Sequence, residues 1–184
     1  MKKYLYLIVA ALLMGFTTSC DSDPSDSSTN AGGTAVKKMC GEWVANVYYC
    51  ESASSDISNI ENWEWENLGS FHLLTYNTAA NKANEMWVDD QGNCYLGDSD
   101  DYSHKIKVNV QYGSKTFSVT DAANEYGENA TVVGGKVMLD AASIDMGRGQ
   151  FAKADSIVYY VNVNGAGSGY LKVSGYRYNF EDLE

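Results

Sequence analysis

The chain has 184 residues, a formal net charge of −11 and 12% aromatic residues. This acidic balance argues against nucleic acid as a partner and against direct contact with anionic lipid headgroups, because like charges repel. After removal of a leader, about 145 residues are enough for one domain that folds without a disulfide or a structural metal. We expect no cofactor and no metal.

The first twenty residues follow the order of a secretory signal peptide. A basic start at Lys2 and Lys3 and an apolar run over residues 4–16 lead through small residues to Cys20. A spanning helix needs about 20 apolar residues, so this run is too short to cross a bilayer. We predict a signal peptide over residues 1–19. Loss of its two lysines leaves 11 basic against 24 acidic residues, a net charge of −13.

The cysteine after those small residues resembles the lipobox of bacterial lipoproteins. The resemblance implies that Cys20 carries acyl chains, whereas in ordinary secretion it would have no such role. Residues 20–35 contain few large apolar side chains, so we predict a flexible acidic tether there. Its first aspartates look like the surface-export signal of lipoproteins from Gram-negative gut anaerobes. That likeness implies the outer leaflet of the outer membrane; the periplasmic face, with a merely solvating linker, is the alternative.

Residues 36–184 have the pattern of one all-β domain. A helical turn is expected over residues 35–39 and another is possible within residues 141–153. Between and beyond them, alternation of polar and apolar residues and enrichment in valine and tyrosine mark about eight strands. The candidate segments are 43–50, 70–76, 85–88, 105–111, 115–120, 131–133 and 136–139 joined as a tight hairpin by Gly134-Gly135, 156–163 and 169–178.

Strands linked in sequence order by short connections pair antiparallel with their neighbours. Eight of them can close into an up-and-down β-barrel, which removes the exposed edges. We therefore predict an eight-stranded antiparallel barrel, with a two-sheet β-sandwich as the alternative. The first strand begins at Gly41-Glu42-Trp43, and Arg177 lies late in the last strand. Such a pair resembles the lipocalin and calycin signature, which implies that Trp43 closes the barrel base and Arg177 stacks on its indole.

A closer resemblance covers residues 36–180. The chain is similar there to the lipid-binding putative hydrolase family, lipocalin-like lipoproteins of Gram-negative gut anaerobes, and this implies an eight-stranded barrel and a small apolar ligand. Residues 51–66 and 97–103 depart from the family pattern as insertions that would alter the barrel mouth. The motifs that carry the resemblance are Gly41–Trp43, Phe71–Asn77, Glu85–Asp90, Lys105–Val108, Ala154–Val158 and Ser174–Arg177.

We therefore expect a lipid-anchored barrel that binds a small apolar or amphipathic molecule without transforming it. A bulky or charged substitution at Val108 or Phe117 would then block the ligand. Trp63 and Trp65, in the first insertion, either stand at the mouth or pack the insertion onto the barrel. If they stand at the mouth, a glycan-binding surface module is the alternative function. The predicted lumen residues are Val47, Tyr49, Phe71, Leu73, Ile106, Val108, Phe117, Val119, Ile157, Tyr159 and Val173.

Catalytic chemistry finds little support in the sequence. His72 is out of phase with its apolar neighbours, so we expect it on the surface, and we expect His104, which opens a polar strand, to be exposed. No Gly-x-Ser-x-Gly turn is present. An esterase-like hydrolase depending on His72 remains a second alternative, and no catalytic residue is assigned.

Neither the acidic nor the cysteine residues predict a metal site. Asp89-Asp90 in a turn, and the aspartates of residues 98–101, are expected to be solvated, because their spacing is not that of a helix–loop–helix calcium site. Cys40, Cys50 and Cys94 match no zinc motif. We expect free thiols. Cys40 and Cys50 flank an extended strand that holds them too far apart to pair, so any bridge would use Cys94.

Overall fold

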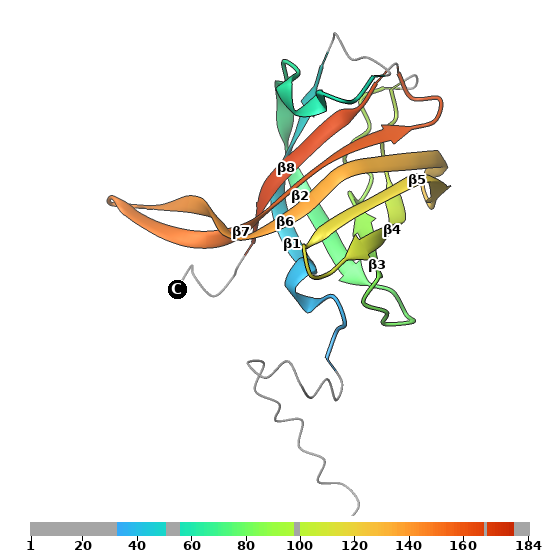
Figure 1. Ribbon diagram of the computed structural model, residues 1–184. Helices are drawn as coiled ribbons and strands as arrows, with labels where there is room; N and C mark the ends of the chain where they lie inside the picture. Colours follow the sequence, from blue (N-terminus) through green and yellow to red (C-terminus); the bar gives the residue numbers. More distant parts are fainter. Residues whose placement is uncertain (1–32, 51–55, 98–99, 168, 179–184) are drawn as a thin grey trace, which may run out of the picture. The chain divides into compact units, whose positions relative to one another are not determined.

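The computed structural model describes residues 33–50, 56–97, 100–167 and 169–178. Eight strands form a closed antiparallel barrel in which each strand pairs with the next and β8 pairs with β1 (Figure 1). The predicted up-and-down barrel is confirmed. Its elements are η1 Lys37–Met39, β1 Gly41–Tyr49, η2 Ile60–Asn62, β2 Glu66–Asn77, β3 Glu85–Asp89, β4 Lys105–Gln111, β5 Thr116–Asn124, β6 Gly127–Gly147, β7 Gln150–Val163 and β8 Leu171–Arg177.

Several predicted features lie outside the described residues. They are the signal peptide, Cys20, nearly all of the tether, residues 51–55 of the first insertion and Asp98. The described chain begins beside the barrel, where the Ala35 amide donates to Asn81 Oδ1 at 2.8 Å and Asn81 Nδ2 donates to the Gly33 carbonyl at 3.2 Å. Within the described ranges, none of the helices has the length and apolar character needed to span a membrane.

Alternation along the strands decides which side chains enter the barrel. In β4, Ile106, Val108 and Val110 are buried while Lys107 and Asn109 between them are exposed. Successive side chains of a strand point to opposite faces, so one face of each strand fills the interior. Strand pairing keeps these faces in phase around the barrel, as at the β1–β8 seam, where Trp43 pairs with Arg177.

One apolar cluster fills the interior and draws side chains from all eight strands and from the connections. The predicted lumen residues all take part in it. Nine of them are buried members, and Tyr49 and Val119 are partly buried and pack against it. Trp43, Leu73, Met86, Ile106, Ile157 and Tyr159 have no exposed surface at all.

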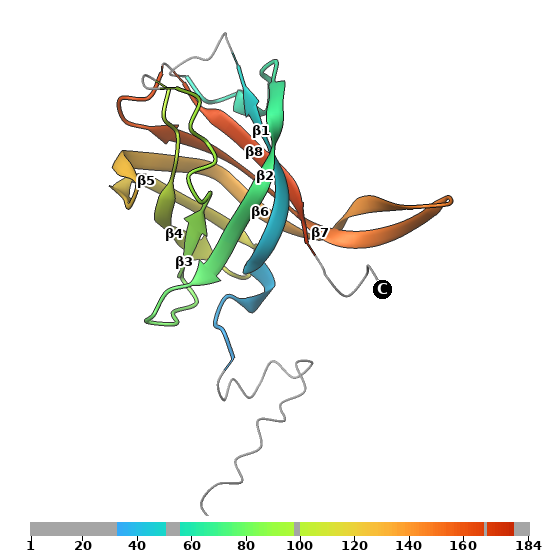
Figure 2. The same ribbon diagram turned by 180° about the vertical axis from the view of Figure 1, so that it is seen from behind.

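Connections between strands alternate between two ends of the barrel (Figure 2). We call the end with η1 and the start of β1 the closed end. The opposite end, which carries the β1–β2, β3–β4, β5–β6 and β7–β8 connections, is the mouth end.

Trp43 and Arg177 meet at the closed end. The Arg177 Cζ atom lies 4.5 Å from the centre of the Trp43 ring. The guanidinium also donates to the Lys38 carbonyl at 2.9 Å, to the Cys40 carbonyl and to the Asp155 carboxylate at 3.0 Å. These bonds tie η1, which precedes β1, to β7 and β8, so the arginine holds the closed end together.

The glycine of the Gly41-Glu42-Trp43 motif has a steric role in that arrangement. A Cβ atom on Gly41 would lie 2.5 Å from Nη1 of Arg177. A larger residue there would push the guanidinium away from its present place beside β1. The position of this glycine, two residues before Trp43, is therefore explained by the space that the Arg177 side chain occupies.

The hairpin predicted at Gly134-Gly135 is wrong. Both glycines lie inside β6, where the pairing with β7 shifts between Val133 and Lys136. Gly134 has a φ of +61°, and a Cβ on Gly135 would lie 2.5 Å from the Phe117 ring. The glycines form a bulge that makes room for a core aromatic ring, and a bulge has the same local preference for glycine as a turn.

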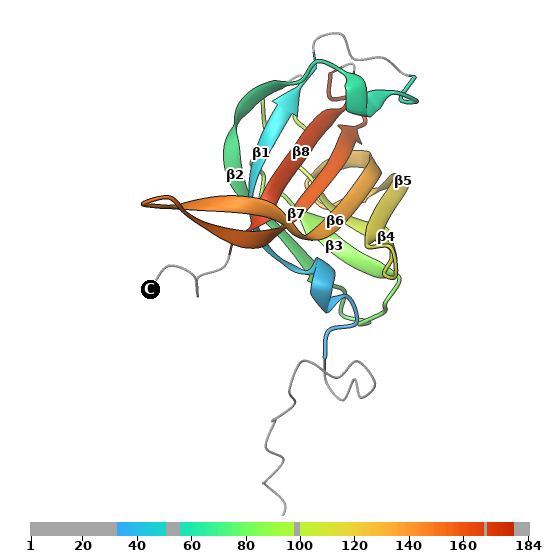
Figure 3. The same cartoon turned by 60° about the vertical axis from the view of Figure 1, so that its left-hand side comes forward.

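The helical turn considered within residues 141–153 is also wrong. These residues extend β6 and β7 as a two-stranded arm that leaves the barrel (Figures 1 and 3). The two strands of the arm are paired as far as Gly147 and Gln150. The turn between them contains Gly147 and Gly149, whose φ values are +82° and +76°. Phe151, near its tip, is 66% exposed.

Candidate functional site

The connection between β3 and β4 folds back into the mouth end of the barrel over its described residues, 90–97 and 100–104. We call it the mouth segment. Cys94 and Tyr102 belong to the apolar core cluster although they lie in this connection. Backbone bonds close the segment on itself: the Tyr102 amide donates to the Cys94 carbonyl at 3.0 Å, and the Asp90 amide donates to the His104 carbonyl at 3.0 Å.

Asp90 organises the mouth segment from within. Its carboxylate accepts bonds from the backbone amides of Gly92 at 3.0 Å, Cys94 at 2.7 Å and His104 at 2.9 Å. Asp90 has no exposed surface. The prediction of a solvated acidic turn is therefore wrong here: burial of the carboxylate is compensated by three amide donors, which a hydrophobicity pattern does not reveal.

His104 is buried as well, against the prediction that it is exposed; it has no accessible surface. Its Nδ1 lies 2.8 Å from the Tyr102 carbonyl, which only accepts, so Nδ1 carries the proton and Nε2 accepts from the Tyr159 hydroxyl at 2.7 Å. The sequence did contain the signal, because His104 lies two residues before inward-facing Ile106 and shares its phase.

Asp90, Cys94, His104 and Tyr159 form what we call the buried polar cluster. Burial, followed by the charge of Asp90 and a bond to its carboxylate, raises the pKa of the Cys94 thiol well above its usual value. Burial likewise holds the pKa of the Tyr159 phenol well above its usual value. A nucleophilic cysteine needs a lowered pKa, so this environment does not activate Cys94 for hydrolysis.

The predicted free thiols are confirmed for all three cysteines that the structure describes. Cys50 and Cys94 are buried and Cys40 is half-buried. Burial raises the pKa of the Cys40 thiol to about 11, in spite of the nearby Arg177 guanidinium.

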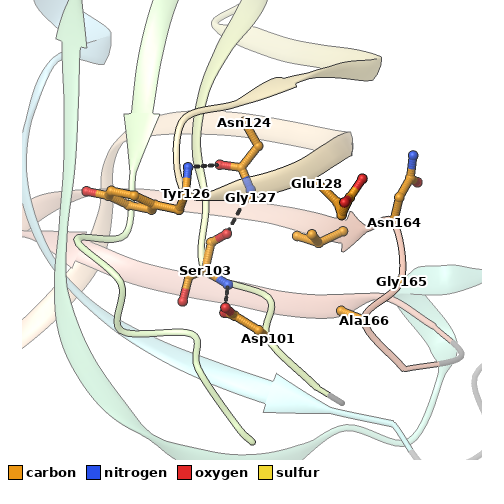
Figure 4. Close-up of a pocket in the computed structure, with 10 residues that line it drawn as sticks. Asp101, Ser103, Asn124, Tyr126, Gly127, Glu128, Asn164, Gly165 and Ala166 are labelled. Atoms are coloured by element: carbon orange, nitrogen blue, oxygen red, sulfur yellow. Dashed lines mark hydrogen bonds between the residues drawn. The ribbon is translucent and has the colours of Figure 1, made fainter. Parts of the chain in front are cut away.

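Next to the buried polar cluster, a pocket of about 260 Å³ opens at the mouth end (Figure 4). The mouth segment, the β5–β6 turn and the β7–β8 connection each contribute to its wall. Val163 and Ala166 line it and also belong to the core cluster, so apolar side chains of the barrel interior form part of its wall. The lining consists of Asp101, Ser103, Asn124, Tyr126, Gly127, Glu128, Val163, Asn164, Gly165 and Ala166.

Hydrogen bonds hold the rim of this mouth pocket in place. Asn124 Nδ2 donates to the Ser103 carbonyl at 2.9 Å, and its Oδ1 accepts from the amides of Lys105 at 2.9 Å and Tyr126 at 3.2 Å. The Ser103 amide donates to Asp101 Oδ1 at 2.9 Å. One amide side chain thus joins the β4 start to the β5–β6 turn, and the rim is ordered before any ligand arrives.

Asp89 supports the same region from the outer side. The phenols of Tyr76 and Tyr126 donate to its two carboxylate oxygens at 3.0 and 2.9 Å. Burial and these bonds raise the pKa of each tyrosine to about 12. Asp89 is 7% exposed, so it too departs from the predicted solvated turn.

Trp63 and Trp65 pack the first insertion onto the outer wall of the barrel. Their rings stack with centres 5.6 Å apart, and Trp65 lies 5.6 Å from Tyr160. Tyr160 follows inward-facing Tyr159 in β7 and therefore faces outward. The Trp65 indole donates to the Ile60 carbonyl at 3.2 Å. Of the two placements considered from the sequence, packing against the barrel is the one observed.

His72 lies on the exposed outer face of β2, as predicted from its phase. Its Nδ1 is 2.6 Å from Glu42 Oε1, and its ring meets the edge of Tyr178 at 5.4 Å. The buried polar cluster and the mouth pocket contain neither His72 nor Glu42, so the two histidines occupy unrelated environments.

The protein is thus a closed β-barrel with an apolar interior and a polar-rimmed pocket at its mouth end. The family model for lipid-binding putative hydrolases matches residues 28–179 of this chain. The chain belongs to that family, and the family and the barrel both support lipid binding. No curated protein matches the chain in sequence.

Proposed function

We propose that this protein is a lipid-anchored lipoprotein of the cell envelope whose barrel binds a small amphipathic molecule. Its apolar part would enter the interior and its polar end would occupy the mouth pocket. The observation that carries the proposal is that the two share residues: Val163 and Ala166 belong both to the pocket lining and to the core cluster. A ligand seated there keeps its polar end among rim groups while its carbon is buried.

The chemistry of the rim narrows the class of ligand. Asp101 and Glu128 contribute carboxylates, and the described lining contains no basic side chain. A neutral or cationic polar end therefore suits the pocket better than a carboxylate or phosphate, which the acidic rim would repel. Burial of apolar ligand surface drives binding by roughly 25 cal/mol per Å², before ordering costs. The interior already holds large side chains, so a slender ligand such as a monoacylglycerol fits the barrel better than a bulky one.

Native mass spectrometry of residues 31–184, purified gently and then extracted with solvent, tests this function. We expect an added mass that solvent removes and that reloads from monoacylglycerols in preference to sterols and to fatty acids. Preferential uptake of free fatty acids would contradict the inference that the acidic rim repels a carboxylate. A bare mass that takes up nothing would contradict lipid carriage itself.

Two adjacent residues of β5 make a matched pair of variants for the same assay. Val119 is half-buried against the core, and Thr120 beside it is exposed on the outer face. Val119→Phe is expected to reduce ligand uptake about tenfold or more by filling interior space, with Thr120→Phe unchanged. Val108 and Phe117 are only 1% and 3% exposed, so bulk added there also strains the core. Equal uptake by both variants would place the ligand outside the barrel.

The anchoring part of the proposal rests on the sequence pattern before Cys20 and the acidic residues after it. Labelling of cells with radioactive palmitate should mark the wild-type chain and leave Cys20→Ser unmarked. Digestion of intact cells by an added protease distinguishes the outer leaflet, where the barrel is degraded, from the periplasmic face, where it is protected. An unlabelled wild-type chain would remove lipid anchoring from the proposal.

A second candidate is glycan binding on the outer wall: Trp63 and Trp65 pack there and not at the mouth, but both stay half-exposed and could stack on a sugar ring. It predicts that Trp63→Ala abolishes binding on a glycan array while Val119→Phe has no effect. Because Trp65 also covers Tyr160, its own substitution would change packing and is less informative.

A further inference from the structure

Three side chains of the mouth segment bring different metal-binding atoms together. Asp90, Cys94 and His104 offer an oxygen, a sulfur and a nitrogen that all lie within 4.8 Å of one another. All three residues have no exposed surface. His104 Nδ1 lies 3.8 Å from Asp90 Oδ2. Ligand atoms of a tetrahedral zinc site, at about 2.0–2.3 Å from the metal, stand roughly 3.3–3.8 Å apart, so the three atoms must move closer together and Nδ1 must turn away from the Tyr102 carbonyl.

The charge of the cluster favours a cation. Three backbone amides donate to the Asp90 carboxylate, but with a neutral His104 imidazole no full positive charge lies beside it among the described residues. A divalent cation would supply a counter-charge that amide dipoles provide only in part. Zinc accepts thiolate, imidazole and carboxylate ligands together, whereas calcium and magnesium prefer oxygen alone.

The surroundings of His104 also suit a ligand histidine. A metal-binding imidazole generally donates its second ring N–H to a nearby oxygen, which fixes the ring. Tyr159 Oη lies 2.7 Å from Nε2 and can fill that role from the adjacent strand β7. We infer that the protein binds one zinc ion per chain through Asp90 Oδ2, Cys94 Sγ and His104 Nδ1 at the mouth end of the barrel.

Binding would require two proton changes. The Cys94 thiol loses its proton to solvent. The imidazole stays neutral but moves its proton from Nδ1, where it now bonds to the Tyr102 carbonyl at 2.8 Å, to Nε2, which then donates to Tyr159. The alternative is that the cluster only stabilises the mouth segment through its existing hydrogen bonds. In that case the protein binds no metal there.

A zinc ion here would be structural. Three protein ligands leave one tetrahedral position for a water or a carbonyl, as in catalytic sites, but the donors are fully buried and a substrate has no access to them. The ligands lie near the two ends of the mouth segment, so the metal would tie these ends together beside the mouth pocket. The site differs from both the lumen and the pocket lining, and its test does not depend on the proposed lipid ligand.

Metal-free protein is titrated with zinc, and separately refolded from urea with zinc present in case the folded barrel admits metal slowly. We expect one equivalent of zinc by elemental analysis after gel filtration. Cobalt substitution should add the charge-transfer absorption that a thiolate ligand produces. Zinc at about 100 times its Kd should raise Tm by roughly 5 °C or more.

Matched cysteine variants separate this site from adventitious binding. Cys94→Ser and His104→Gln should each weaken binding by about 100-fold or more, since even second-sphere changes cost about 10–100-fold. Cys50→Ser removes an equally buried thiol and should change nothing. Asp90→Asn is avoided because that carboxylate also holds three backbone amides. No uptake by either route, or uptake that survives both Cys94→Ser and His104→Gln, would overturn the inference.

Discussion

Replacing Trp43 with alanine is expected to lower the free energy of unfolding by about 4 kcal/mol, within the range for a buried tryptophan. The side chain has no exposed surface and plugs the closed end of the barrel. Its indole N–H donates to Thr75 Oγ1 at 2.8 Å, and that hydroxyl in turn donates to the Met39 carbonyl at 2.7 Å. The substitution therefore leaves a cavity, breaks a chain of buried hydrogen bonds and removes the surface on which Arg177 stacks.

Urea denaturation followed by circular dichroism measures this loss, with Trp87→Ala as the control. Trp87 is half-buried on the outer face of β3, and its ring contacts the Lys105 ammonium at 5.8 Å. Removal of the Trp87 side chain is expected to lower the free energy of unfolding by about 1 kcal/mol, the value for a cation–π pair that is only partly buried. Equal costs for the two variants would show that Trp43 does not close the barrel in the way described.

Gly175→Ala is expected to destabilise the barrel by about 3 kcal/mol, at the upper end of overpacking effects. Gly175 lies in β8 between Ala45 of β1 and Ile157 of β7. An added Cβ would meet the Val44 carbonyl oxygen and lie 2.6 Å from the Ala45 Cα. Both contacts are with backbone, so no side-chain rotation relieves them and the two strands must separate.

The direction of the stability change tests this prediction. A glycine-to-alanine substitution normally stabilises a compatible strand or turn, because it reduces the entropy of the unfolded chain. Gly113→Ala, in the β4–β5 turn, is the matched control, since nothing lies within 4 Å of its added Cβ. Thermal melting should show a large fall in Tm for Gly175→Ala and little change or a slight rise for Gly113→Ala. A Gly175→Ala protein as stable as wild type would contradict the close approach of β1 and β8.

Strand number and the inward face were predictable because each depends on a local pattern, whereas the closed end was inferred from the resemblance of Gly41-Glu42-Trp43 and Arg177 to the lipocalin signature. Period-two alternation in β4 is visible over seven residues, and it places Ile106 and Val108 inside without any long-range information. Trp43 and Arg177 lie far apart in the chain but share the inward phase of strands that pair when a barrel closes.

The mouth end was predicted poorly. A turn such as Asp89-Asp90 is polar whether or not it is buried, and only the return of residues 90–104 into the barrel supplies the amides that make its burial possible. Gly134-Gly135 likewise has the composition of a turn, while the Phe117 ring on a neighbouring strand makes it a bulge.

By itself, the sequence determined about eight strands and their apolar inward faces, because alternation along a strand is a local property; the choice of a closed barrel over a sandwich, and the roles of Trp43 and Arg177, rested on a family resemblance. Only the tertiary structure decided that Asp90, Cys94 and His104 meet in a buried cluster, that Trp65 covers the outer wall, and that β6 and β7 run on as an arm. These features depend on how connections fold over the finished barrel. The burial of a polar side chain there is decided by partners distant in sequence, which local patterns do not contain.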